Sequence, residues 1–160
     1  METTGPAMLI CDVGPVRFAL VLSDVVEILP IVPLWRPPTM PRPLVGFVMV
    51  RGETVAVLSP ALLFDGDAAM PDTIDLSAHL VRVRGGAALL VDRADAIVTD
   101  PVVRAVTPDL SYRGCVTGMV DAGGGDAHVL SVPQLLADGA AARIAALTAE
   151  AARRGREWAA

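Results

Sequence analysis

The side chains most often used in catalysis are few and scattered in this chain. It has two histidines, His79 and His128, and two cysteines, Cys11 and Cys115, each in or beside a short apolar segment. No GxSxG, HExxH or CxxC motif occurs, and the histidines and cysteines lack the local pairing of a zinc site. The sequence therefore predicts no catalytic centre, no metal site and two buried free thiols, so we do not expect an enzyme.

Composition and charge exclude several further classes of protein. The run Gly-Gly-Gly-Asp at 123–126 lacks the Lys-Ser/Thr pair of a phosphate loop and is typical of a hairpin loop, so no cofactor is expected. A net charge of −5 over 160 residues disfavours nucleic acid as a partner. No segment reaches the roughly 18 apolar residues of a membrane span, and METTGPAMLICD is unlike a signal peptide. We expect a cytoplasmic protein without direct membrane insertion.

One arginine stands out because its surroundings are apolar. The stretch VGFVMVRGETVAVL at 45–58 has two apolar runs separated by Arg51, Gly52 and Glu53. Such a turn usually holds Asn-Gly or Asp-Gly, because these residues accept a positive φ at low cost. A guanidinium group can bind a carboxylate or carbonyl groups in a fixed fork. Arg51 therefore either fastens the hairpin or presents its side chain to a partner, and the residues alone leave both interpretations open.

Short segments rich in Val and Ile, separated by Gly, Pro and Asp, predict an all-β fold. An acidic segment at 65–76 with Gly66 and Pro71 is the expected linker. After Pro133 an apolar spacing of three to four residues in an Ala-rich background predicts a helix that docks on the strands. The expected strands lie near 8–13, 16–22, 31–34, 45–50, 54–58, 79–84, 87–91, 115–120 and 127–130.

The chain also resembles itself. Arg17–Ile28 matches Gly86–Ile97 at an offset of 69 residues, and 45–59 matches 117–131 at an offset of 72. The second match places Gly46 on Gly118. Two offsets in similar register predict two copies of one small β unit, while generic β composition is the alternative explanation.

The segments FALVLSDVVEIL and LVGFVMVRGETVAVLSPALLF, with a Pro-rich run between them, resemble the CheW-like domain of bacterial chemotaxis proteins. HLVRVRGGAALLVDRADAIV and CVTGMVDAGGGDAHVLSVPQLL resemble the second half of that domain, so the likeness covers about 8–136. The most specific piece is the Arg51-Gly52 corner with Gly46 upstream. The sequence departs from the family pattern at Met49 (usually Asn), at Ser59 and Ser131 (usually Asp), and at Ala88 (usually Gly).

The resemblance implies two SH3-like five-stranded β-barrels closed by a C-terminal helix. It divides a single domain, 1–160, into a first subdomain near 8–64, a second near 77–132 and a helix near 133–157.

The resemblance also implies a non-catalytic adaptor that bridges the cytoplasmic tip of a chemoreceptor and the regulatory domain of a histidine kinase at membrane-associated receptor arrays. The alternative is a small-molecule-binding β-barrel that acts as a sensor. The partner-binding positions carried over from the family motif are Val25, Glu27, Gly46, Arg51 and Gly52.

Overall fold

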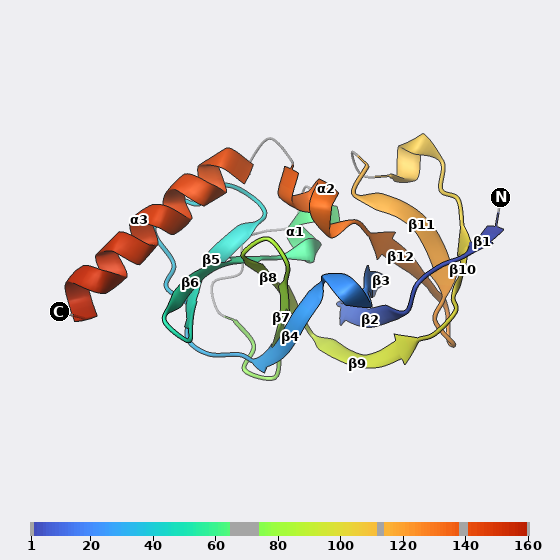
Figure 1. Ribbon diagram of the computed structural model, residues 1–160, viewed down its shortest axis with the longest axis horizontal. Helices are drawn as coiled ribbons and strands as arrows, with labels where there is room; N and C mark the ends of the chain where they lie inside the picture. Colours follow the sequence, from blue (N-terminus) through green and yellow to red (C-terminus); the bar gives the residue numbers. More distant parts are fainter. Residues whose placement is uncertain (1, 65–73, 112–113, 138–140, 160) are drawn as a thin grey trace.

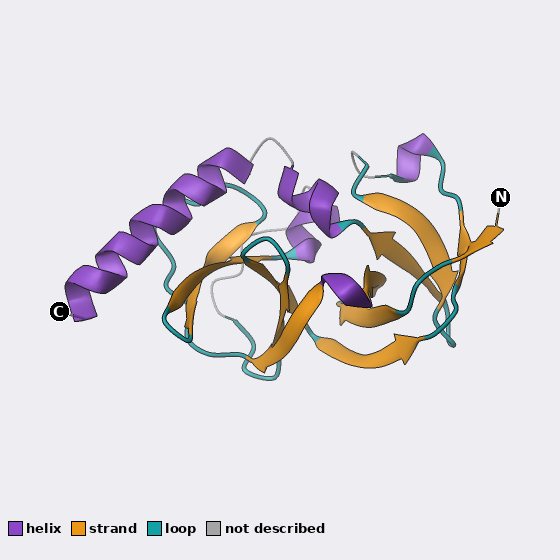
Figure 2. Ribbon diagram, in the orientation of Figure 1, coloured by secondary structure: helices purple, strands orange, loops and turns teal. Residues whose placement is uncertain are grey.

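The computed structural model describes residues 2–64, 74–111, 114–137 and 141–159. Its strands form two sheets that lie side by side, with short helices near their junction and one long helix along the outer side of one sheet (Figures 1 and 2). The prediction of an all-β class is confirmed.

In chain order, the elements are β1 (Glu2–Thr4), β2 (Met8–Val13), β3 (Val16–Val21), the 3-10 helix η1 (Leu22–Asp24), β4 (Val25–Pro30), β5 (Leu44–Val50), β6 (Glu53–Leu58), α1 (Pro60–Phe64), β7 (His79–Val83), β8 (Ala87–Val91), β9 (Arg93–Val98), β10 (Val102–Arg104), the 3-10 helix η2 (Pro108–Leu110), β11 (Val116–Asp121), β12 (Asp126–Leu130), α2 (Val132–Ala137) and α3 (Ala141–Ala159).

Neither sheet closes into the barrel that the sequence led us to expect. The five-stranded sheet runs β4-β7-β8-β6-β5, so β4 and β5 are its two edges, and the seven-stranded sheet runs β1-β10-β11-β12-β3-β2-β9. The outer side of β5 is met instead by Trp35, which forms an isolated bridge with Phe47. Pro33, Pro37 and Pro38 flank this bridge, and because proline has no N–H they prevent a longer ladder.

The strands are also distributed differently from the two contiguous subdomains at 8–64 and 77–132. The hairpin β2-β3 joins the sheet of β9, β11 and β12, while the hairpin β7-β8 joins the sheet of β4, β5 and β6. The exchange is made by two parallel pairs, β12 with β3 and β6 with β8. Each half of the sequence therefore completes the sheet of the other half.

The internal sequence match corresponds to a structural repeat. The order β5-β6-β8-β7-β4 in one sheet has the same connectivity as β11-β12-β3-β2-β9 in the other. Gly46 and Gly118 each follow a register shift in the equivalent hairpin, and they pair with Val57 and Val129. The offset of 72 residues is thus the same on both strands of the hairpin.

Three groups of buried side chains make up the core. A central core lies between the sheets and includes Leu9, Phe18, Phe47 and Leu89. An inner cluster lies on the other face of each sheet, one in the five-stranded sheet and one in the seven-stranded sheet. The single C-terminal helix expected at 133–157 is two helices, α2 and α3, and buried Ala151 joins α3 to the central core.

One local prediction was wrong, and another falls mostly outside the described residues. The strand expected at 31–34 is absent, and the strand lies earlier, at β4, where exposed and half-buried residues alternate. Most of the expected linker, 65–73, is not among the described residues.

Candidate protein-interaction site

The tip of the β5-β6 hairpin is a tight turn built from Arg51 and Gly52. Val50 pairs with Glu53, which leaves a loop of two residues. Their φ angles are 46° and 82°, so both residues are left-handed, as in a type I′ turn. Glycine adopts this conformation readily, whereas an arginine is strained there. The left-handed backbone therefore explains the glycine at position 52, but it does not explain the arginine at position 51.

The side chain of Arg51 is fastened to a small charge cluster. Its Nη2 donates a hydrogen bond to Oε1 of Glu27 on β4. The same oxygen lies 3.4 Å from Nη1 of Arg82 on β7, and Nη2 of Arg82 lies 2.5 Å from Oε2 of Glu53 on β6. We call Glu27, Arg51, Glu53 and Arg82 the charge cluster. It ties the hairpin tip to β4 across the open side of the five-stranded sheet.

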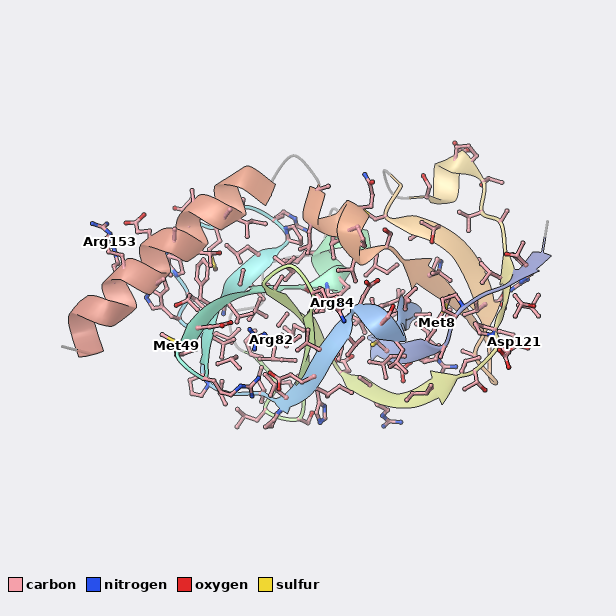
Figure 3. All side chains as sticks on the ribbon, viewed as in Figure 1. Met8, Met49, Arg82, Arg84, Asp121 and Arg153 are labelled. Atoms are coloured by element: carbon pink, nitrogen blue, oxygen red, sulfur yellow. The ribbon has the colours of Figure 1, made fainter. Side chains whose placement is uncertain are left out.

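The two arginines of the cluster differ in exposure. The side chain of Arg82 is 14% exposed and that of Arg51 is 64% exposed. Figure 3 shows Arg82 within the five-stranded sheet. Arg82 thus anchors the two carboxylates from inside, and Arg51 presents most of its guanidinium group to the outside.

The charges of the cluster reinforce one another. The hydrogen bond from Arg51, followed by the smaller effect of Arg82, lowers the pKa of Glu27 from its ordinary value of 4.5. The same hydrogen bond to Glu27 raises the pKa of Arg51 above its ordinary value. Both groups are therefore charged throughout the neutral pH range.

The strand β4 also offers apolar surface, on the face opposite to the Glu27 side chain. Val26 and Ile28 are 52% and 42% exposed, while Val25 is half-buried against the central core. Since β4 is an edge strand, its outer backbone groups are open to pairing with another chain. Among the expected binding residues, Glu27 and Arg51 are therefore brought together at an exposed edge, and Val25 supports that edge from the core.

Gly46 has a different position from the other expected binding residues. It is buried, and a Cβ atom there would lie 3.0 Å from Trp35 O and 3.1 Å from Leu34 Cβ. Arg36 holds the same segment on β5 by donating a hydrogen bond from Nε to the carbonyl of Val45, at 2.9 Å. Because Gly46 has no side chain, the Pro-rich segment can lie close to the sheet. Gly46 therefore shapes the surface but is not itself exposed on it.

The sequence reasoning missed Arg82 and Glu53. The signal for Arg82 was present in the strand HLVRV, where Arg82 lies between Val81 and Val83 and shares its face of the strand with Leu80. A charged residue inside an apolar strand requires a partner of opposite charge.

The histidines and cysteines form no common site. His79 lies in the five-stranded sheet and His128 in the seven-stranded sheet. Cys11 and Cys115 are buried in the central core and form no disulfide, and burial raises the pKa of Cys11 to about 12. Within the described residues, no group of three or more His, Cys, Asp or Glu side chains is arranged to hold a metal ion.

These features define a duplicated β scaffold with a charged, partly apolar surface at one sheet edge. The model of the CheW-like domain matches residues 7–140, so the chain belongs to the CheW-like domain family, whose members are scaffold and adaptor proteins of chemotaxis. Among solved structures it is similar to the scaffolding protein TtCheW from Thermoanaerobacter tengcongensis, with a TM-score of 0.67 and 16% identity over 81% of this chain and 86% of that one. A search of curated proteins found no match.

In the part of the chain that the structure describes, no helix combines the length and the apolar character needed to cross a membrane.

Proposed function

We propose that this protein is a non-catalytic adaptor that couples the cytoplasmic tip of a chemoreceptor to the regulatory domain of a histidine kinase. In this proposal it works in the cytoplasm at membrane-associated receptor arrays. The charge cluster and the exposed edge of β4 are the surface that one of these partners binds. Family membership supports the adaptor role, and the geometry of Arg51 supports the choice of surface.

The backbone conformation and the exposure of Arg51 are the observations that support this choice of binding surface. The residue occupies a left-handed backbone position that favours Asn or Gly, and most of its side chain is exposed. A surface ion pair adds little to stability, whereas arginine is frequent among the residues that dominate the energy of an interface. An arginine at this position is therefore better explained by recognition than by folding.

The sensor alternative is less well supported by the packing. Both inner clusters consist of buried side chains, for example Val57 and Leu80 in one sheet and Met8 and Val129 in the other. A small-molecule site of the expected kind needs a hollow lined with a few convergent polar groups. The side chains fill the places where a barrel interior would provide that hollow.

The test is the substitution Arg51→Asn, because asparagine suits the turn and lacks the guanidinium group. We expect the melting temperature to stay within about 3 °C of the parent. Binding to the receptor tip or to the kinase regulatory domain, measured by calorimetry, should weaken at least about tenfold. The matched control is Arg104→Asn, which removes an exposed arginine paired with Asp126 in the other sheet and should leave affinity unchanged. Unchanged affinity for both partners in Arg51→Asn would refute the proposed surface.

A further inference from the structure

The helix α3 is the last element of the chain. The family match ends at residue 140, and α3 begins at Ala141. It contacts β6 and β5 on the face that belongs to the central core. Figure 1 shows α3 along the outer side of the five-stranded sheet, with its C-terminal end at the far end of the molecule.

The contact between α3 and the sheet buries one small side chain fully and two larger ones in part. Among the side chains described in α3, only Ala151 is buried, and Ile144 and Leu147 are partly buried against the central core. Its polar residues bond within the helix: Arg154 and Arg153 lie 3.0 and 3.8 Å from Glu150. Figure 3 shows Arg153 pointing away from the sheet. Since the one fully buried residue is an alanine and Ile144 and Leu147 are buried only in part, little apolar area holds α3 and this docking is weak.

The helix also underfills the surface on which it lies. A cavity of about 510 Å³ separates its C-terminal half from β5 and Trp35, with Met49 and Gly155 in its walls. A second cavity, of about 680 Å³, lies between β6 and the positions Ala145, Ala149 and Ala152. Both hollows are grooves open to solvent along the helix, and Ala145 and Ala149 are exposed beside the second one. Larger side chains at such positions have room to enter the grooves and contact the sheet.

We propose that this surface is a second interaction site, which accepts an amphipathic helix of a partner, and that α3 is the helix of the chain itself that occupies it until displaced. We call it the α3 face. The partner helix carries Leu, Ile, Met or Phe at the three-to-four spacing that fills such grooves. The residues of the α3 face are Trp35, Phe47, Met49, Thr54, Ala56 and Leu58.

Two properties favour a helix as the occupant. The α3 face already holds a helix, so its shape is suited to one. Phe47, Ala56 and Leu58 are each 2% exposed beneath α3, while Trp35 and Met49 are 44% and 54% exposed at its margin. Release of α3 would uncover a continuous apolar strip beside side chains that are already accessible.

The first part of the test releases α3 in the full chain. Ala151→Glu places a charge at the buried contact, and Ala146→Glu makes the same change at an exposed position of the same helix. Hydrogen exchange of residues 141–159 should be at least about tenfold faster in Ala151→Glu and unchanged in Ala146→Glu. Unchanged protection in Ala151→Glu would overturn the proposal.

The second part measures occupation of the α3 face. The probe is a labelled peptide of residues 141–159 in which Ala145, Ala149 and Ala152 are replaced by leucine. We expect it to bind Ala151→Glu at least about tenfold more tightly than the parent chain, because release of α3 removes the competitor. Equal binding to both chains, or binding to neither, would refute the α3 face as a helix site. Arg51→Asn should leave peptide binding unchanged, so failure of the adaptor proposal is distinguishable from failure of this one.

A reducible cross-link provides the opposite perturbation. A Cβ added at Gly155 lies 3.4 Å from Met49 Cε, the far end of that side chain, so a direct disulfide is too short. In the variant Met49→Cys with Gly155→Cys, a short bis-maleimide linker that contains a disulfide spans the length of the methionine side chain and holds α3 on the sheet. The native cysteines are buried and do not compete for the linker. The intact cross-link should abolish peptide binding, and reduction of its disulfide should restore it. Peptide binding that is equal before and after reduction would overturn the proposal even if Ala151→Glu does not fold.

Discussion

The two sheets are built from the same repeat, and their inner clusters correspond residue by residue. Six buried positions of the seven-stranded sheet have counterparts 69 or 72 residues away in the five-stranded sheet. Five of these positions are apolar in both sheets, while Ile10 corresponds to Arg82. The pairs are Met8 with Leu80, Ile10 with Arg82, Ala19 with Ala88, Val48 with Val120, Val55 with Ala127, and Val57 with Val129.

The difference at this one position extends to its neighbours. Arg82 pairs with Glu27 in one sheet, and Ile10 pairs with Ala96 in the other. The position equivalent to Arg51 is Gly123, in the longer loop of the β11-β12 hairpin. The seven-stranded sheet is therefore completed without charges at any of these positions. The comparison indicates that the fold does not require the charge cluster, which supports a role in recognition.

The second difference concerns the outer edge of each hairpin. Trp35 bridges to Phe47 beside β5, and at equivalent positions Arg104 pairs with Met119 beside β11. The first contact remains a single bridge between prolines, whereas the second is part of β10, which pairs in turn with β1. The prolines therefore explain why one sheet has five strands and the other has seven.

The largest effect should come from separating the two copies. Because each sheet takes strands from both halves, the fragments 1–64 and 74–160 should each be unfolded alone and should regain β structure when mixed. Far-UV circular dichroism and the cooperativity of thermal unfolding measure this. A cooperative transition in either isolated fragment would contradict the strand exchange.

The equivalent glycines should respond differently to the same substitution. A Cβ at Gly118 would lie 2.5 Å from Val103 Cγ1 and 2.9 Å from the carbonyl oxygen of Arg104 in β10. At Gly46 the nearest atoms are 3.0 Å away, and the loss should come mainly from the backbone, because L side chains rarely adopt its φ of 157°. Gly118→Ala should therefore cost about 3 kcal/mol through the clash, and Gly46→Ala about 2 kcal/mol through backbone strain. Urea denaturation of the two variants gives both values, and a larger loss in Gly46→Ala than in Gly118→Ala would contradict this explanation.

The sequence predicted much of this architecture, because alternating apolar segments and tight turns are local signals. The strands β2, β5, β6 and β8 lie within one residue of their expected positions. The exchange of hairpins was not predictable in this way, because the parallel pairs β6-β8 and β12-β3 join segments distant in the chain. No single segment encodes which hairpin pairs with which sheet.

The site was predicted in part for a related reason. Both Glu27 and Arg51 were expected at the site, since both residues belong to recognisable motifs. The second pair, Arg82 with Glu53, depends on the exchanged strand β7 and was missed. The strand β4 was also missed, because its alternating half-buried pattern leads directly into the Pro-rich segment.

The charge cluster should be replaceable by the residues of the other sheet. Arg82→Ile alone leaves Glu27 and Glu53 without their inner anchor and should lower the melting temperature by about 3–6 °C. The double variant Glu27→Ala with Arg82→Ile copies Ala96 and Ile10, and it should recover most of this loss. Calorimetric melting of both variants, with Ile10→Val as a control for ordinary core repacking, tests the correspondence. A double variant less stable than Arg82→Ile would mean that the two sheets are not interchangeable at these positions.

The smallest effect should be a dependence of the charge cluster on pH that the other sheet lacks. The folded protein lowers the pKa of Glu27 below its ordinary value of 4.5, chiefly through the hydrogen bond from Arg51. A carboxyl group with a depressed pKa contributes its stabilisation fully above the ordinary value and loses it as the pH falls through the folded value. Because Arg51, the main partner of Glu27, is 64% exposed, the contribution is small and is screened by salt. We therefore expect the parent to melt slightly higher than Glu27→Gln at pH 7 in low salt, with the difference vanishing in acid below pH 4.5 and in high salt. The melting temperatures of both proteins across this pH range measure the effect.

The matched variant is Ala96→Gln in the other sheet, whose melting temperature should differ from that of the parent by an amount that does not change with pH. A difference in melting temperature between the parent and Glu27→Gln that persists in acid would mean that Glu27 acts through packing and not through its charge.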